Sequence, residues 1–222
     1  MSTYVYMRIL ESAPRRYDWG LRLLSLGRIT AVYDAVAAAA VGTDVAPRVL
    51  EIGCGTGNLT AALLARGATV TAIDQNPDML AVAEEKLGTG DGRLTLREMA
   101  AVEIADRFPP AAFDAVAASL VLSEMSEEEQ QYVLEAARRL LCPGGRLAVA
   151  DEVQPPGLLA RLRYACVRWP LAALTYVLTQ TSTSAVRDLA PRVRAAGFRV
   201  VAERLPQGGM TLVIGEKPAE AQ

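Results

Sequence analysis

The feature that most constrains this chain is a glycine-rich loop between an apolar run and a helix-like segment. The loop reads Gly53-Cys-Gly-Thr-Gly57, and the apolar run before it contains one acid, Glu51. Glycine adopts backbone conformations that other residues avoid and lets a ligand approach the main chain. The first amides of the following helix, 59–65, have no partner within that helix and are free to bind a ligand. The pattern predicts strand, tight loop and helix around a bound ligand.

The spacing of the glycines and the positions of two acids discriminate between ligands. A dinucleotide fingerprint is G-x-G-x-x-G, whereas this loop is G-x-G-x-G and Asn58 stands where the third glycine would be. The carboxylate of Glu51 suits an ammonium group better than a pyrophosphate, because like charges repel. A second apolar run, 69–73, ends in Asp74, and an acid there can accept hydrogen bonds from ribose hydroxyls. S-adenosylmethionine (SAM), with an amino-acid head and an adenosine tail, fits both acids.

With these motifs the chain resembles the class I SAM-dependent methyltransferases, in particular those of the ubiquinone and menaquinone type. The resemblance continues through 113–116, a fourth strand, and 141–146, the turn before a fifth. It implies an α/β fold of the class I methyltransferase Rossmann-like kind. That fold is a seven-stranded sheet with helices on both faces and the last strand antiparallel. The resemblance also implies SAM as the cofactor and S-adenosylhomocysteine as its product.

Local signals along the chain agree with such a fold, because strand-like and helix-like segments alternate, which indicates a parallel sheet. Asn76 followed by Pro77 predicts a helix start, and Ser126 with Glu129 forms a capping-box sequence. We expect further strands at 69–73, 94–98, 113–119, 146–150, 198–205 and 210–216, and helices at 21–40, 59–65, 76–87, 126–141 and 185–196.

Composition and charge limit the classes of protein to which this chain can belong. At 222 residues, 51% of them hydrophobic, the chain can hold one α/β domain with a full core. We expect an N-terminal helical cap at 1–45 and a SAM-binding domain at 46–222. A net charge of −2 argues against nucleic acid as the main partner. Three dispersed cysteines and no histidine argue against a disulfide framework or a metal site. No signal-like pattern opens the chain, so we expect a cytoplasmic protein.

A helical insert is predicted at about 154–183, longer than an ordinary connection. It contains Trp169 and Tyr176, and its three arginines and Pro170 argue against a membrane span. Two interpretations stay open. The insert is either a lid that shapes the acceptor pocket, with peripheral contact to lipid or to a partner, or a helical pair packed on the sheet for stability. We favour the lid, because loops at strand carboxyl ends carry function in α/β sheets, and we assign Trp169 and Tyr176 to the substrate.

Ligands of such sheets bind beyond the carboxyl ends of the strands, here 54–58, 74–79, 99–100, 119–124 and 151–152. Met79 is a candidate apolar wall for adenine, and a core role at its helical spacing is an equal alternative. Relatives place an acid after the third strand, where this chain has Met99 and Ala100. Adenine would then be held by backbone and apolar contacts, or by Glu98 or Glu103. The predicted cofactor residues are Glu51, Gly53, Cys54, Gly55, Gly57, Asn58, Asp74, Gln75, Met79, Met99, Ala100 and Ser119.

The catalytic candidates are Glu124, Asp151 and Tyr17. Methyl transfer from a sulfonium mainly needs alignment and a dry site. A base is needed only where the acceptor loses a proton, and this chain has no histidine to supply one. The resemblance implies that Glu124 stands where many relatives carry histidine, and that an aromatic near Tyr17 closes over the methionine end of SAM. We expect both to face the substrate; the alternatives are a solvated acid before a helix and a tyrosine on a helix face.

Three kinds of function stay open. One is methylation of a lipophilic or planar small molecule such as a quinol. The second, slightly preferred, is methylation of a corrinoid held by a partner protein. Here 6–18, 98–99, 123–124 and 151–152 are similar to the corrinoid protein-associated methyltransferases, and a reduced cobalt acceptor needs no base. The third is a SAM-binding regulator without turnover, since motifs for binding are not motifs for catalysis. The sequence predicts no oligomeric state.

Overall fold

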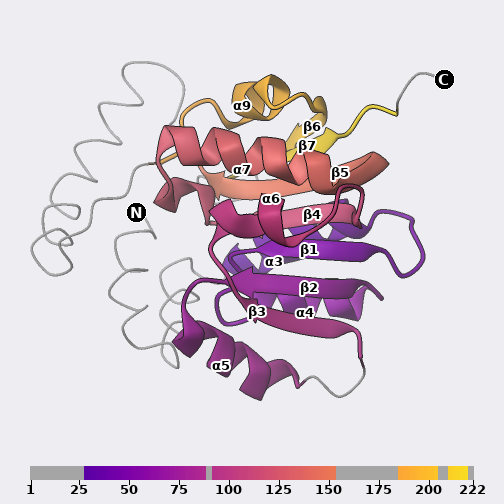
Figure 1. Ribbon diagram of the computed structural model, residues 1–222, viewed down its shortest axis with the longest axis vertical. Helices are drawn as coiled ribbons and strands as arrows, with labels where there is room; N and C mark the ends of the chain where they lie inside the picture. The colour runs from indigo at the N-terminus through magenta and orange to yellow at the C-terminus, as the bar shows by residue number, and fades with distance from the viewer. Residues whose placement is uncertain (1–27, 89–91, 154–184, 205–209, 220–222) are drawn as a thin grey trace, which may run out of the picture.

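The computed structural model describes residues 28–88, 92–153, 185–204 and 210–219. Their central feature is a seven-stranded sheet with the strand order β3-β2-β1-β4-β5-β7-β6 (Figure 1). The strands are β1 (Arg48–Ile52), β2 (Thr69–Asp74), β3 (Leu94–Glu98), β4 (Phe113–Ser119), β5 (Leu141–Glu152), β6 (Arg199–Arg204) and β7 (Met210–Glu216).

The pairing of the strands confirms the predicted sheet. The strands β1 to β5 are joined by parallel pairs, whereas β7 pairs antiparallel with both β5 and β6. The chain runs outward from β1 to β3 on one side and returns to β4 on the other side of β1. This reversal is a topological switch point, where the loops after two adjacent strands diverge and leave room for a ligand.

Helices cover both faces of the sheet, and two clusters of buried side chains lie between the layers (Figure 1). Strand residues alternate between them: Leu50 and Ile52 face one cluster and Val49 faces the other, as the two-residue period of a strand requires. The first cluster packs on α6 (Ile104–Arg107), α7 (Glu127–Leu140) and α9 (Leu189–Ala195), and the second on α3 (Arg28–Val41), α4 (Asn58–Ala65) and α5 (Pro77–Leu87).

Two helix starts form as their local sequences predict. The side-chain oxygen of Asn76 accepts hydrogen bonds from the amides of Asp78, at 2.9 Å, and Met79, at 3.4 Å. Ser126 and Glu129 exchange hydrogen bonds in a capping box, with Ser126 N donating to Glu129 Oε2 at 2.8 Å. Both arrangements satisfy amides that have no partner within the helix. They fix the start of α5 close behind β2, and the start of α7 after the short segment that follows β4.

Four elements described next differ from expectation. The helix predicted at 185–196 begins only at Leu189, because Val186 N–H donates to Glu152 O at 2.8 Å and holds the preceding residues against the end of β5. β5 begins at Leu141 rather than at 146, since the glycine turn also bonds to the backbone of Lys217. The short helices η1 (Ala101–Glu103) and α6 carry no strong start signal and were not expected.

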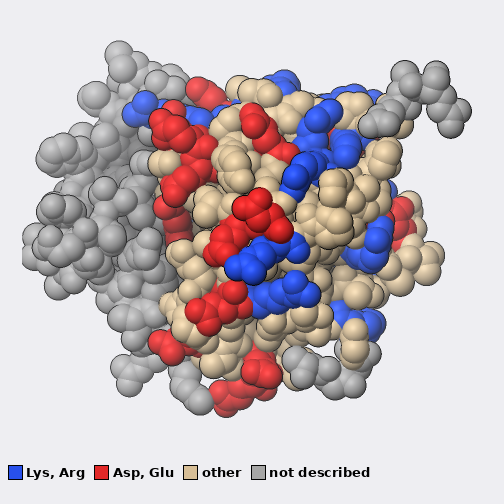
Figure 2. All heavy atoms as spheres, in the orientation of Figure 1, with Lys and Arg blue, Asp and Glu red and all other residues tan. Residues whose placement is uncertain are grey.

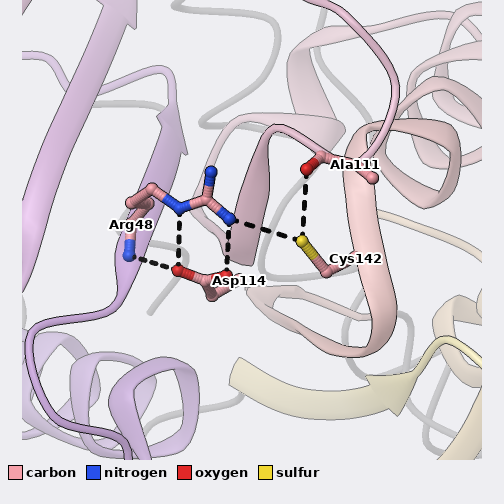
Figure 3. Close-up of polar contacts among 4 residues, drawn as sticks. All are labelled: Arg48, Ala111, Asp114 and Cys142. Atoms are coloured by element: carbon pink, nitrogen blue, oxygen red, sulfur yellow. Dashed lines mark hydrogen bonds and ion pairs between the residues drawn. The ribbon is translucent and has the colours of Figure 1, made fainter.

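The starts of three strands are joined by one polar cluster (Figure 3). It lies at the end of the sheet where the parallel strands begin, opposite the switch point. The main-chain N–H and Nε of Arg48 donate to Asp114 Oδ2 at 2.8 and 3.1 Å, and its Nη2 donates to Oδ1 at 2.8 Å. The same Nη2 lies 3.4 Å from Cys142 Sγ, and the thiol of Cys142 donates to Ala111 O at 3.2 Å. The cluster ties β1 to the starts of β4 and β5.

Of the predicted cap at 1–45 the structure describes 28–45, which contain α3, and the insert at 154–183 lies outside the described residues, so both remain predictions. Within the described part of the chain, no helix is long and apolar enough to cross a membrane.

Candidate functional site

The three glycines of the loop after β1 serve three different purposes, although all have positive φ. A Cβ on Gly53 would lie 2.5 Å from Val121 Cγ2, and one on Gly57 would lie 2.8 Å from Leu87 Cδ1. A Cβ on Gly55 would meet nothing within 4 Å. Gly53 and Gly57 are therefore needed for packing of the protein itself. Gly55 leaves the loop backbone open to a ligand.

Asp74, at the end of β2, holds the shape of this loop. Its Oδ2 accepts a hydrogen bond from the amide of Gly55 at 2.8 Å, and its Oδ1 accepts one from the amide of Asn76 at 2.9 Å. Burial raises the pKa of Asp74, and these backbone hydrogen bonds oppose the rise because they favour the charged form. The carboxylate thus connects the loops after β1 and β2, beside the switch point between β1 and β4.

Glu51 is a buried acid with an incomplete set of hydrogen bonds. Its side chain is 1% exposed, and its Oε2 accepts a hydrogen bond from Thr60 Oγ1 at 2.6 Å. Its Oε1 is buried and has no hydrogen-bond partner in the described part of the chain. Burial raises the pKa of Glu51 to about 8, the Thr60 hydrogen bond lowers it, and the charge of Asp74 adds to the rise. A buried oxygen without a partner is unfavourable, so this position suits a ligand that brings a donor or a positive charge.

These groups meet in one pocket at the carboxyl ends of β1, β2 and β4. Glu51 of β1, Gly55 of the loop after it and Asp74 of β2 all line the pocket. Ser119, the last residue of β4, and Glu124, in the segment after β4, line it as well. Acids, loop backbone and apolar side chains therefore converge on a single cavity.

Comparison with known proteins identifies the family. A methyltransferase-domain family matches residues 49–145. A demethylmenaquinone methyltransferase of Clavibacter sepedonicus is 32% identical over 95% of this chain and 89% of its own length. One of Thermus thermophilus is 34% identical over 94% of this chain and 99% of its own length. The chain belongs to the class I SAM-dependent methyltransferases.

A solved structure shows the same fold as this methyltransferase. An O-methyltransferase family protein from Burkholderia thailandensis superposes with a TM-score of 0.72 at 21% sequence identity. The match covers 95% of the methyltransferase and 62% of the Burkholderia chain. The methyltransferase thus spans less than two thirds of that structure, and the likeness establishes the fold only.

Most of the cofactor residues predicted for the methyltransferase line this pocket. Three do not in the described part of the chain. Gly57 precedes α4 and packs on α5, and Met99 lies in the core with its amide bonded to Asp74 O at 2.9 Å. The amide of Ala100 donates to Glu103 Oε1 at 3.2 Å. The predicted residues in the pocket are Glu51, Gly53, Cys54, Gly55, Asn58, Asp74, Gln75, Met79 and Ser119, together with Glu124 from the substrate and catalytic set.

The other catalytic and substrate candidates lie elsewhere. The side chain of Asp151 is fully buried and is not among the residues that line the described pocket. Its position therefore does not support the predicted role as a base that touches the acceptor. Burial raises the pKa of Asp151 to about 6. Tyr17, Trp169 and Tyr176 lie outside the described residues, so their roles remain predictions.

Six residues that line the pocket of the methyltransferase were not predicted as site residues from the sequence. Four of them lie in segments that follow strands, where the sequence predicted a ligand site but did not identify these positions. Tyr33 and Leu59 lie on α3 and α4, and only the packing of these helices turns them toward the pocket. The six are Tyr33, Thr56, Leu59, Asn76, Leu120 and Val121.

Proposed function

We propose that this SAM-dependent methyltransferase methylates a lipophilic, quinol-type small molecule. The observation that carries the proposal is the pair of relatives aligned over almost their whole length, both of which are named demethylmenaquinone methyltransferases. An alignment of that extent includes the acceptor side of the fold as well as the cofactor loop. These relatives give no support to the corrinoid acceptor preferred from the sequence, so the quinol alternative replaces it.

The polar groups of the pocket support one placement of SAM. The unpartnered Oε1 of Glu51 suits the ammonium group, because an opposite charge offsets the penalty of burying a carboxylate. Asp74 accepts the amide of Gly55 at one oxygen and the amide of Asn76 at the other, and its carboxylate keeps further lone pairs for the ribose hydroxyls. Gly55 leaves space above the loop between these two acids. When bound, SAM supplies an activated methyl group.

The residues after β4 support a role in acceptor chemistry. Leu120 and Val121 give this wall of the pocket an apolar surface, which favours a flat organic ring and excludes water. Glu124 is the acid on the same wall. A quinol is most nucleophilic after loss of a hydroxyl proton, and we assign Glu124 as the group that accepts this proton.

The test uses the purified chain, SAM with an isotopically labelled methyl group, and a short-chain naphthoquinol that lacks the ring methyl. We expect one labelled methyl on the quinol for each S-adenosylhomocysteine formed, measured by mass spectrometry. The oxidised quinone is the matched control and should not react, because it has no hydroxyl proton to lose. If the chain binds SAM but leaves the reduced quinol unmethylated, the quinol assignment is wrong. A reduced corrinoid protein would then be the next acceptor to assay.

A further inference from the structure

The segment directly after β4, residues 120–125, forms a turn that faces the pocket, and it is called the acceptor-side turn below. It contains the short helix η2 (Leu122–Glu124) and contributes Leu120, Val121 and Glu124 to the lining. Val121 also fills the space that a side chain at Gly53 would need. The turn therefore packs on the cofactor loop through Val121 and itself forms the acceptor wall of the pocket.

The backbone of this turn is strained, and β5 holds it at two points. Leu120 has φ +61°, a conformation that residues other than glycine adopt only where the surroundings enforce it. Its amide donates to Ala150 O at 2.9 Å. The amide of Ser123 donates to Asp151 Oδ2 at 3.1 Å, while Asp151 Oδ1 accepts the amide of Glu152 at 2.8 Å. The buried carboxylate of Asp151 thus binds the middle of the turn to the end of β5.

A second buried side chain holds the turn from α7. Gln130 is 3% exposed, and its Nε2 donates to Leu122 O at 3.0 Å and to Met125 O at 3.1 Å. One amide group therefore satisfies two main-chain carbonyls of the same turn. The first-turn position of Gln130 on α7 explains this reach, because α7 begins directly after the turn.

We propose that Asp151 and Gln130 are positioning residues for methyl transfer, which fix the backbone of the acceptor-side turn and so hold Glu124 and Val121 at the acceptor. Neither side chain is among those that line the described pocket. Burying a carboxylate and an amide is unfavourable unless hydrogen bonds compensate. Here Asp151 Oδ2 and Gln130 Nε2 both bond to the turn, although Gln130 Oε1 has no partner among the described residues. The proposal rests on the proposed function only in taking the turn to face the acceptor.

Two test variants and two matched controls separate positioning from general stability. Asp151→Asn keeps the shape of the side chain but replaces the carboxylate with a neutral group that has one acceptor oxygen. One of the two backbone amides that Asp151 binds, those of Ser123 and Glu152, then faces an NH2 group. Gln130→Met removes the amide at similar length. Gln131→Met makes the same change one residue along α7, where the side chain bonds Glu135 at 2.8 Å on the surface. Asp114→Asn weakens the cluster at the strand starts, away from the pocket.

The first measurement is amide hydrogen exchange by mass spectrometry, which needs no acceptor. Both test variants should speed exchange in peptides covering 120–125 by about tenfold, because Asp151→Asn weakens the bond from the Ser123 amide and Gln130→Met removes the bonds to Leu122 O and Met125 O. Peptides covering α4 should keep their protection, and neither control should change the turn. Unchanged exchange of the turn in both test variants would overturn the proposal.

The second measurement is steady-state kinetics with the reduced quinol, with SAM affinity measured separately. We expect kcat of the test variants to fall on the order of tenfold to a hundredfold, since a small misplacement strongly affects transfer. SAM affinity should change by less than about threefold, because the cofactor groups are untouched. Loss of activity only in proportion to loss of folded protein, as in Asp114→Asn, would contradict positioning. If the wild type does not methylate the quinol, the proposed function fails, and the exchange result still decides the role of the two residues.

Discussion

At the scale of single residues, Glu51 combines deep burial with an incomplete set of hydrogen bonds. It is buried, its pKa is raised to about 8, and one of its oxygens has no partner within the described residues. At neutral pH most of the free protein therefore carries a protonated Glu51. A ligand ammonium at this carboxylate favours its charged form and lowers its pKa. Ligand binding and proton release are coupled at this residue.

SAM binding near pH 7 should therefore release a proton from Glu51. Below about pH 8 the affinity should rise with pH, because the free protein must lose the proton to bind, and above that pH it should level off. Calorimetry in buffers with different ionisation enthalpies measures the release directly. Glu51→Gln should abolish it, whereas Glu124→Gln should not. A binding enthalpy independent of the buffer would contradict the coupling.

Asp74 and Gly55 give a second prediction for single residues. Asp74→Ala should weaken SAM binding by about 1.5–3 kcal/mol, the range for hydrogen bonds to a charged group. Gly55→Val should abolish binding, because a branched residue at φ +51° is strained and fills the open space above the loop. Asp78→Ala, an exposed acid in the first turn of α5, is the control for charge. Wild-type affinity in both folded test variants would remove this loop from the cofactor site.

At the scale of elements, the two ends of the parallel strands have different roles. The loops at the carboxyl ends of β1, β2 and β4 build the pocket. At the opposite end, the cluster of Arg48, Asp114 and Cys142 joins the starts of three strands (Figure 3). The hydrogen bonds from Arg48 hold the pKa of Asp114 below its usual value, with burial opposing them. This cluster should affect stability and leave ligand binding unchanged.

Asp114→Asn should lower the free energy of unfolding by about 1 kcal/mol at neutral pH, a modest value because the ion pair is partly exposed to solvent. Because folding lowers the pKa of Asp114, its contribution is present above the unfolded pKa near 4 and is lost as pH falls through the lower folded value. Urea unfolding at two pH values measures this, with SAM affinity as the second readout. A larger effect on SAM affinity than on stability would argue against a purely structural cluster.

At the scale of the whole molecule, acidic and basic side chains of the described residues are distributed unevenly along the strand direction. On the face shown in Figure 2, acidic side chains gather mainly toward the side where the strands end, and Lys and Arg mainly toward the side where they begin. Helix α7 follows this division, with three glutamates in its first turn and Arg138 and Arg139 in its last. Acids near a helix start and bases near its end are favourable with respect to the helix dipole. The carboxyl ends of β1, β2 and β4, where the pocket lies, are therefore on the more acidic side of this face among the described residues.

The sequence by itself determined the parts of this protein that are encoded by neighbouring residues. The glycine loop, the acid after the second strand, the cap at Asn76 and the capping box at Ser126 are all local signals. Turn conformation, capping and strand alternation depend on residues a few positions apart, so they can be recognised without the fold. These signals were sufficient for the α/β class and indicated SAM as the ligand, whereas the antiparallel last strand was an implication of the resemblance to the class I methyltransferases.

The tertiary structure alone decided what depends on contacts between distant segments. Only the fold shows that Gly53 makes room for Val121, and only the fold turns Tyr33 of α3 toward the pocket. The sequence placed Asp151 at a strand end, as if to meet a substrate, but in the fold its side chain is buried and its carboxylate accepts the amide of Ser123 in η2. Which way a side chain points at a strand end depends on what packs over it, and that neighbour is set by the fold of the whole chain rather than by the residues beside it.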